Sequence, residues 1–164
     1  MSKWPALKPK TPFGQLPVLR HGTLRLGQSI AILQYVASQV GLSSYSDAST
    51  ARMASVALAA EDLLAAVRPH KANKNYEGAR EELSKWAGHF DKWLAQGNDA
   101  SEKLHFVDGK LSYADVVVYD AFEQALNDFL KVDDAAETIR RDFGAPLLAA
   151  HFTNIDKKAK PLAE

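Results

Sequence analysis

The stretch Thr11-Pro12-Phe13-Gly14-Gln15-Leu16-Pro17-Val18-Leu19, near the start of the chain, decides the fold. Its apolar end, Leu16 to Leu19, is typical of a short strand, and a turn is expected at Arg20-His21-Gly22-Thr23. Polar and apolar residues alternate from Thr23 to Leu26, so we predict an antiparallel β-hairpin. Considered alone, Pro17 is interpreted as an ordinary trans proline at the start of an edge strand, where its missing N–H is tolerated. A cis bond would turn the Leu16 backbone outward, toward an extended ligand.

A helix is predicted directly after the hairpin. Gln28-Ser29 precedes apolar residues at helical spacing, from Ile30 to Val40, which places Ser29 near the N-cap. The unpaired amides and positive dipole end of such a helix suit a carboxylate. From the residues alone, a plain helix cap is the simpler interpretation.

Together these segments resemble the second half of the N-terminal domain of a cytosolic glutathione transferase, and most of all the sigma class, which includes prostaglandin D synthases and S-crystallins. The resemblance rests on Trp4, Lys8, the run Pro12 to Pro17, and the pattern Gln28-Ser29-x-Ala31-Ile32-x-x-Tyr35. It implies that residues 1–41 form a truncated thioredoxin-like α/β remnant, a β-hairpin plus a helix, that binds glutathione.

The resemblance also implies individual roles. Trp4 and Lys8 would reach the glycyl carboxylate of glutathione, and the residue before a cis-proline, Leu16, would pair with the cysteinyl backbone. The Gln28-Ser29 pair would hold the γ-glutamyl carboxylate. The glutathione contacts implied within this segment are Trp4, Lys8, Gln15, Leu16, Pro17, Gln28 and Ser29.

One part of the family pattern has no counterpart here. A sigma-class chain begins with a strand, a helix and a second strand, and the tyrosine that stabilises the glutathione thiolate ends the first strand. This sequence opens at Met1-Ser2-Lys3-Trp4, so the β-α-β segment and its tyrosine are expected to be missing. A thiol of pKa about 8.5 is only slightly ionised at neutral pH without such a donor. We assign no catalytic role to any of the five tyrosines, Tyr35, Tyr45, Tyr76, Tyr113 and Tyr119.

Residues 47–164 are predicted to form an all-α domain, so the fold class is mostly α. Apolar residues recur at helical spacing from Met53 to Val67 and again from Tyr76 to Gln96, with Gly97-Asn98 as the C-cap pair. Leu111-Ser112-Tyr113-Ala114-Asp115-Val116 predicts a capping box that opens a central buried helix and makes Asp115 structural. This Ser-x-Ala-Asp pattern also matches the core helix of the family's C-terminal domain. Two shorter helices are expected at residues 134–142 and 145–154.

The Met53 helix carries a second face, on which Asp62 stands among small residues. Such residues let another helix approach closely, so we hypothesise a homodimer contact there. The resemblance places Asp62 at the glutathione bound by the partner subunit, whereas a solvated helix carboxylate is the plain alternative. The family's pocket for a hydrophobic second substrate would be lined by Leu64, Val67 and Val117, for which core packing is the alternative. The small residues of this face are Ala51, Ser55, Ala59 and Ala66.

Composition narrows the classes of function. The 164 residues carry 20 basic and 20 acidic side chains, which argues against nucleic acid or an anionic membrane as the main partner. The chain has no cysteine, no secretory signal pattern and no apolar run of membrane-spanning length, so a cytoplasmic location is expected. Its histidines never occur at metal-ligand spacing, so we expect no metal and interpret all five as surface or structural: His21, His70, His89, His105 and His151.

Two hypotheses of function follow. In the first, the protein is a glutathione transferase that transfers glutathione to a hydrophobic electrophile, or isomerises one. In the second, it is a non-catalytic member of the family that serves as a binding or structural module, as S-crystallins do. The matched contact residues favour the first hypothesis, and the missing tyrosine favours the second, since a fold alone does not imply activity.

Overall fold

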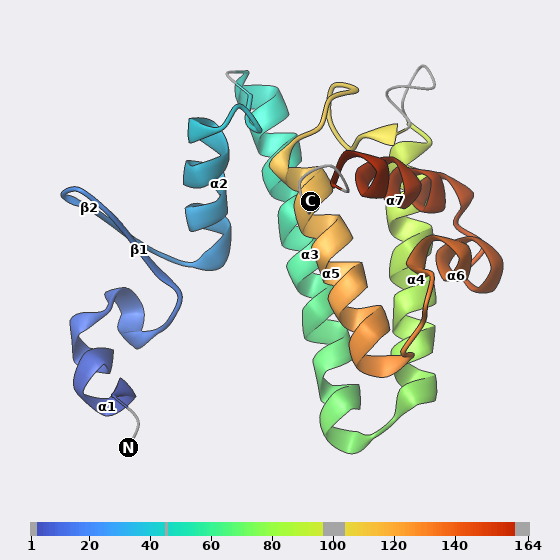
Figure 1. The fold of residues 1–164 in the computed structure, drawn as a ribbon, viewed down its shortest axis with the longest axis horizontal. Helices are drawn as coiled ribbons and strands as arrows, with labels where there is room; N and C mark the ends of the chain where they lie inside the picture. The colour runs from blue at the N-terminus through green and yellow to red at the C-terminus, as the bar shows by residue number, and fades with distance from the viewer. Residues whose placement is uncertain (1–2, 45, 97–103, 160–164) are drawn as a thin grey trace. The chain divides into compact units, whose positions relative to one another are not determined.

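The computed structural model describes residues 3–44, 46–96 and 104–159. The chain divides into two compact units, Met1–Ser44 and Tyr45–Glu164, which we call the N-terminal unit and the helical unit. Helices account for most of the described residues, and the sheet has two strands, so the predicted mostly-α class is confirmed. Figure 1 shows the elements of both units.

The N-terminal unit is a short α/β arrangement built around a hairpin. Its first residues form one turn of helix and two 3-10 turns, which no sequence pattern predicted. The hairpin and one longer helix follow. The elements are α1 (Trp4–Leu7), η1 (Lys8–Lys10), η2 (Pro12–Gly14), β1 (Val18–His21), β2 (Leu24–Gly27) and α2 (Ser29–Gln39).

The predicted antiparallel hairpin is confirmed. Val18 pairs with Gly27 and His21 with Leu24, and the two-residue turn between the strands has Gly22 at φ +59°. Gly22 has no Cβ, so it adopts this conformation without steric cost. The strand begins at Val18 and not at Leu16, because Pro17 has no N–H to give to a ladder.

The two faces of the hairpin differ in chemistry. Leu19 and Leu26 are cross-strand partners on one face, and α2 contacts β2. His21 lies on that same face, and its Nδ1 is 2.6 Å from the hydroxyl of Tyr35 on α2. The other face carries Arg20 opposite Arg25, and both side chains are exposed. One face of the hairpin is therefore joined to α2, and the other is cationic.

Helix α2 forms where it was predicted, with its N-cap at Gln28. Ile32 donates its N–H to the carbonyl of Gln28, at 3.0 Å, so the first helical hydrogen bond begins at Gln28. Gln28 is the N-cap and Ser29 the first helical residue, which confirms that Ser29 lies near the N-cap. Gln28 has φ +74° and ψ 121°, a conformation that residues with a side chain seldom adopt.

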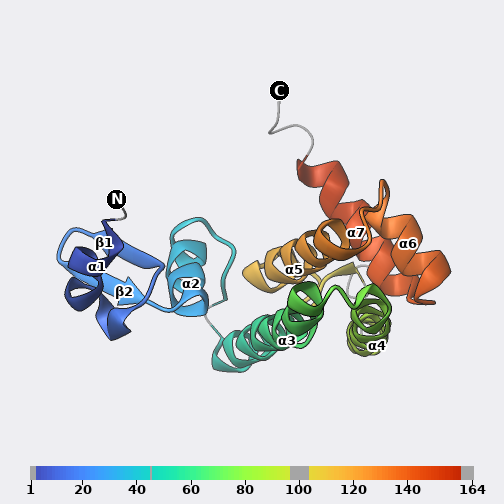
Figure 2. The same cartoon turned by 90° about the horizontal axis from the view of Figure 1, so that it is seen from below.

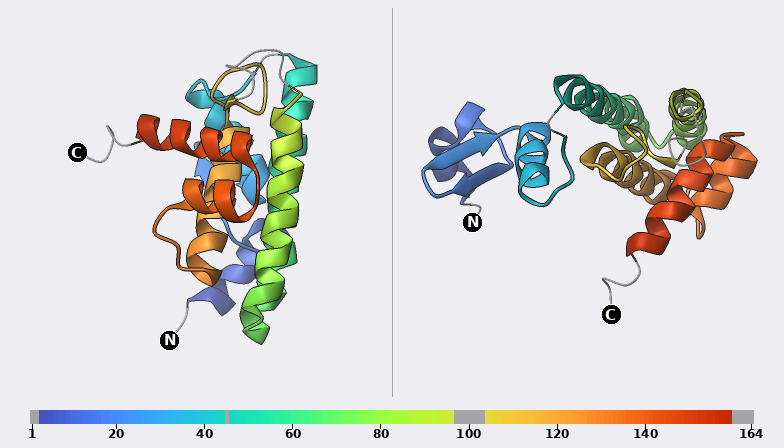
Figure 3. Two further views of the ribbon diagram at one scale, coloured as in Figure 1. Left: turned by 90° about the vertical axis from the view of Figure 1, so that its right-hand side faces the viewer. Right: turned by 90° about the horizontal axis from the view of Figure 1, so that it is seen from above.

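The helical unit is a bundle in which α3, α4 and α5 run side by side (Figures 1 and 2). Helices α6 and α7 pack against each other beside α4 (Figure 3). The predicted helices are present, although α7 extends beyond residue 154. The Gly97-Asn98 cap lies outside the described residues. The bounds are α3 (Asp47–Asn73), α4 (Tyr76–Leu94), α5 (Tyr113–Phe129), α6 (Ala135–Asp142) and α7 (Pro146–Ala159).

Helix α5 is the central helix of this unit, as its apolar pattern predicted. It contacts α3, α4, α6 and α7. The ring of Phe122 lies edge-on to Phe90, at 5.9 Å between centroids, and to Phe152, at 6.0 Å. Such edge-to-face contacts stabilise a core beyond the area they bury. In the part of the chain that the structure describes, no helix combines the length and the apolar character needed to cross a membrane.

Candidate functional site

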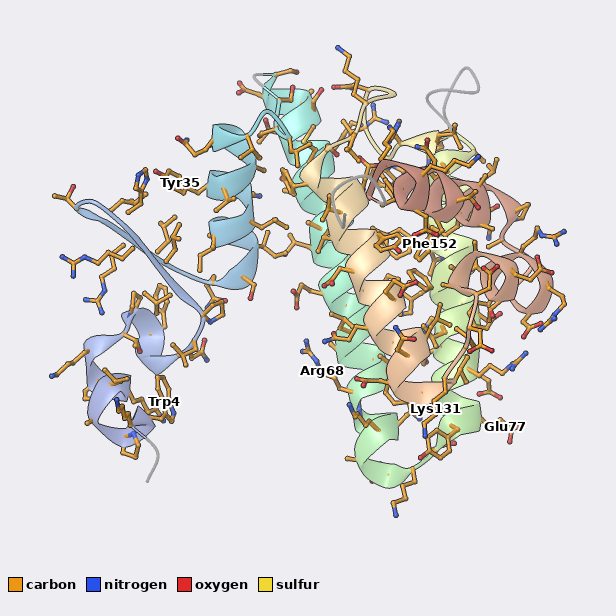
Figure 4. The ribbon with its side chains drawn as sticks, viewed as in Figure 1. Trp4, Tyr35, Arg68, Glu77, Lys131 and Phe152 are labelled. Atoms are coloured by element: carbon orange, nitrogen blue, oxygen red, sulfur yellow. The ribbon has the colours of Figure 1, made fainter. Side chains whose placement is uncertain are left out.

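The residues with implied glutathione contacts, apart from Asp62, all lie in the N-terminal unit. Trp4 is half-buried on α1 (Figure 4), and Lys8 is exposed at the start of η1. The Lys8 side chain runs past Gly14: its Cε would lie 3.6 Å from a Cβ built on that glycine. Gly14 has φ +61°, which a residue with a side chain would adopt only with strain. Gly14 therefore fixes the turn beside the Lys8 side chain.

A close backbone contact joins the two halves of the predicted site. A Cβ on Gly27 would lie 3.2 Å from the Cβ of Pro12 and 3.3 Å from the Phe13 ring. The end of β2 thus rests directly on η2. Because Gln28 and Ser29 follow Gly27, the start of α2 is held next to the turn that leads into Gln15 and Leu16.

The Leu16–Pro17 peptide bond is cis. The resemblance implied this geometry, and the trans interpretation drawn from Pro17 alone is wrong. Leu16 is 67% exposed, and Gln15 is also exposed. The two residues that precede Pro17 are therefore both exposed.

The start of α2, Lys8 and Leu16 carry groups whose chemistry suits an anionic, peptide-like molecule. Ser29 begins an 11-residue helix, whose first amides have no helical acceptors. The dipole of that helix favours a carboxylate at its N-terminus. Lys8 supplies a positive charge, and the exposed residue Leu16 has a backbone donor and acceptor.

The remaining predicted residues lie on helices of the helical unit. Asp62 is exposed on α3, and Leu58, one turn earlier on the same side, is 55% exposed. Leu64 and Val117 are partly exposed, so a ligand could touch them. Val67 is only 1% exposed and belongs to the core of the unit.

Two of the tyrosines that the structure describes are engaged by residues outside the predicted glutathione contacts, and a third is buried. Tyr35 pairs with His21, and Tyr113 is buried at the start of α5. Tyr119 donates its hydroxyl to Asp156 at 2.5 Å. Burial, that bond and the nearby carboxylates of Glu123 and Asp156 raise the pKa of Tyr119 far above its ordinary value. Tyr45 lies outside the described residues.

One cluster of ionisable residues has no counterpart in the sequence patterns, because its members are far apart along the chain. His105 and His151 are both buried and flank the buried carboxylate of Asp115. The Nδ1 atoms of the two histidines lie 3.3 and 3.7 Å from Asp115 Oδ1. The ligand atoms of the three residues lie within 4.8 Å of one another, so geometry alone would admit a metal ion.

Hydrogen bonding accounts for most of this cluster. His105 Nε2 lies 3.2 Å from Lys158 Nζ and 3.4 Å from Asn154 Nδ2, which supply protons and leave Nδ1–H to face Asp115. His151 Nδ1 is 2.9 Å from the carbonyl of Leu104, where it must carry the proton. With both Nδ1 atoms acting as donors, we interpret the cluster as a structural network that joins residues 104–106 to α5 and α7.

Asp115 is the centre of this network. Its carboxylate accepts the N–H and hydroxyl of Ser112, at 2.7 and 2.8 Å, and the N–H of Phe106 at 3.0 Å. Burial alone would raise the pKa of the carboxyl. The His105 bond, the nearby His151 and the Ser112 and Phe106 bonds outweigh burial and hold the pKa of Asp115 below its ordinary value. The predicted capping box and the structural role of Asp115 are confirmed.

Comparisons with known proteins identify the family to which both units belong. Residues 62–160 match the family model described as glutathione S-transferase, C-terminal domain, and residues 2–38 match the glutathione S-transferase N-terminal domain. Glutathione S-transferase 1 of Ascaris suum is 34% identical over 141 residues, which cover 77% of this chain and 66% of that protein. The chain thus spans just under two thirds of the length of this relative.

Solved structures give the same result. The glutathione S-transferase of Ascaris lumbricoides superposes with a TM-score of 0.66 at 28% identity, covering 94% of this chain and 82% of the other. A monomeric glutathione S-transferase of the hookworm Necator americanus superposes with a TM-score of 0.76, covering 99% and 80%. Its 23% identity supports the shared fold alone. With both halves of the chain matched by the family's domain models, the chain belongs to the glutathione S-transferase family.

Proposed function

We propose that the chain binds glutathione in a site of sigma-class type on its N-terminal unit, within residues 1–41. The observation that carries the proposal is the contact of Gly27 with Pro12 and Phe13, which holds two separate parts of the site together. The proposed contacts are Trp4, Lys8, Gln15, Leu16, Pro17, Gln28 and Ser29.

Each end of glutathione has a suitable partner in this arrangement. The γ-glutamyl carboxylate would accept from the Ser29 hydroxyl and the first amides of α2, with the Gln28 side chain beside it. The glycyl carboxylate would pair with the Lys8 ammonium and the Trp4 indole N–H. The cysteinyl residue would pair with the exposed Leu16 backbone.

The proposed reaction is attack by the glutathione thiolate on a hydrophobic electrophile, or isomerisation of one. The partly exposed Leu64 and Val117 are the proposed walls of the second-substrate pocket, and the buried Val67 would support them from behind. No catalytic residue is assigned within this chain. We propose a cytoplasmic location, as for the family's cytosolic members.

We also propose that α3 forms a homodimer contact in which Asp62 reaches the glutathione of the partner subunit. The exposed Asp62, together with Ala51, Ser55 and Leu58, supports this role for the face. Sedimentation velocity of the chain and of an Asp62→Ala variant tests this contact.

Calorimetric titration with reduced glutathione tests the main proposal. Saturable binding is expected, and Ser29→Ala should weaken it at least tenfold, because a hydrogen bond to a charged group contributes about 1.5–3 kcal/mol. Thr23→Ala is the matched control, since Thr23 is an exposed hydroxyl residue of the same unit in the hairpin turn. Absence of binding by the folded chain, or equal effects of the two variants, would contradict the proposal.

A non-catalytic binding or structural module is the second candidate function. It is favoured by the hydrogen bonds of two tyrosine hydroxyls. The Tyr35 hydroxyl is engaged by His21 and the Tyr119 hydroxyl by Asp156, so both already have partners other than a thiolate. Turnover of a chlorodinitrobenzene with glutathione, in which the thiolate displaces chloride, separates the two candidates. Glutathione binding without turnover above the uncatalysed rate would select the module.

A further inference from the structure

The charge of the whole chain conceals a division between its two units. Residues 1–44 contain no aspartate and no glutamate, although an even spread of the 20 acidic residues would place about five there. The basic residues of this segment therefore have no carboxylate partner within their own unit. They are Lys3, Lys8, Lys10, Arg20 and Arg25.

Two of these cations face each other across the hairpin. Arg20 and Arg25 are directly paired in the antiparallel register, so both side chains project from the same face. Like charges at such a position destabilise a hairpin, because the Cβ atoms lie only about 5 Å apart. The face opposite to theirs is the one that carries the Leu19–Leu26 pair and the contact from His21 to Tyr35.

The face of the hairpin that carries Arg20 and Arg25 is hollowed. An open groove of about 620 Å³ is lined by Lys10, Val18, Arg20, Gly22, Thr23 and Arg25. Three of the six lining residues are cations, and Thr23 adds a hydroxyl donor. None of the six is among the proposed glutathione contacts.

We propose that this groove is a second ligand site, for a small molecule with a multiply charged oxyanion such as a diphosphate. Arginine presents a planar fork of donors that matches phosphate oxygens in pairs, and two such forks side by side suit two linked phosphate groups. A bound polyanion would also remove the repulsion between Arg20 and Arg25. A singly charged carboxylate would leave most of the positive charge of the groove unbalanced.

Titration of the chain with inorganic pyrophosphate in 50 mM salt tests this site. Calorimetry measures the affinity, and amide chemical shifts locate the binding. Saturable binding is expected, with the largest shifts at Lys10, Arg20 and Thr23 to Arg25. Arg20→Gln and Arg25→Gln should each weaken binding about tenfold, because each removes charged hydrogen bonds. Arg25→Lys should restore part of the affinity, since it keeps the charge without the fork.

Lys3→Gln is the matched control. Lys3 is exposed in the same unit but does not line the groove, so the variant should bind pyrophosphate within twofold of the parent. Equal weakening by Lys3→Gln and Arg25→Gln would overturn the proposal in favour of a diffuse positive field. Absence of pyrophosphate binding would also overturn it, whether or not phosphatidylserine vesicles or an oligoglutamate peptide bind instead.

Glutathione titrations of the same variants keep this proposal separate from the proposed function. Arg25→Gln should leave glutathione affinity within twofold, because Arg25 is not a proposed glutathione contact. Ser29→Ala should leave pyrophosphate affinity unchanged. Loss of both affinities in either variant would contradict the assignment of two independent sites.

Discussion

Replacing Asp115 by alanine should remove a buried polar anchor of the helical unit. The carboxylate is fully buried and accepts hydrogen bonds from Ser112 N–H, Ser112 Oγ and Phe106 N–H, with His105 close by. Each buried donor left without an acceptor costs about 1–3 kcal/mol. We expect a total loss of about 4 kcal/mol, because some donors regain partners when the structure relaxes. This loss is a large share of the 5–15 kcal/mol that is typical of a domain.

Urea denaturation followed by far-UV circular dichroism measures this loss, since the helical unit holds most of the helix. For a denaturant dependence of about 2 kcal/mol per molar, the midpoint should fall by about 2 M. Asp115→Asn keeps the shape and one acceptor oxygen, so it should lose about half as much. It supplies the measurement if the alanine variant fails to fold.

Asp120→Asn is the control, because Asp120 is exposed on the same helix. An exposed substitution of this kind should change the free energy of unfolding by less than about 0.5 kcal/mol. The reasoning is refuted if Asp115→Ala lowers the midpoint no more than Asp120→Asn does. Such a result would mean that the hydrogen bonds to the carboxylate contribute nothing beyond those that water supplies to the unfolded chain.

Three further outcomes follow from the geometry. Asp91→Ala should lower the free energy of unfolding by about 1–2 kcal/mol in urea melts. The Asp91 carboxylate accepts hydrogen bonds from the first amides of α7, from Leu147 at 2.7 Å and Leu148 at 3.0 Å. An unchanged midpoint would exclude this capping role. Burial lowers the pKa of His151, so the unfolded chain takes up a proton first as the pH falls below about 6.5, and stability should decrease there by up to about 1.4 kcal/mol per pH unit. Melts between pH 7.5 and 5.5 measure this slope. His151→Gln should flatten it, and equal slopes in the two proteins would contradict the assignment of the pH dependence to His151. Gly27→Ala should displace the end of β2 from Pro12 and lower the stability of the N-terminal unit by about 1 kcal/mol. Amide exchange in the hairpin should become faster. Unaltered exchange would show that Pro12 and Phe13 move aside without cost.

Local patterns predicted the parts of the fold that depend on neighbouring residues. The capping box at Ser112 and Asp115 spans three positions, so its chemistry is legible in the sequence. The hairpin and the helices follow from periodicity in the same way. The cis bond at Pro17 was different: the residue alone suggested trans, and only the family resemblance implied cis.

Features that depend on distant residues could not be predicted. His105 and His151 flank one carboxylate although 46 positions separate them, and no spacing rule joins residues so far apart. The backbone conformation of Gln28 at the N-cap of α2, φ +74°, was not predicted either, because its side-chain type does not favour a positive φ. The net charge of the whole chain likewise gave no sign of the cationic hairpin, because it averages over both units.

The backbone of Gln28 creates a conflict between rigidity and recognition. A residue with a side chain at φ +74° stores about 1–3 kcal/mol of strain, which glycine would release. Gln28→Gly should therefore raise the melting temperature of the N-terminal unit while removing the amide proposed to contact glutathione. A stabilising screen would select this change and an affinity screen would reject it, so directed evolution of the protein toward heat resistance and toward tighter binding must diverge at residue 28.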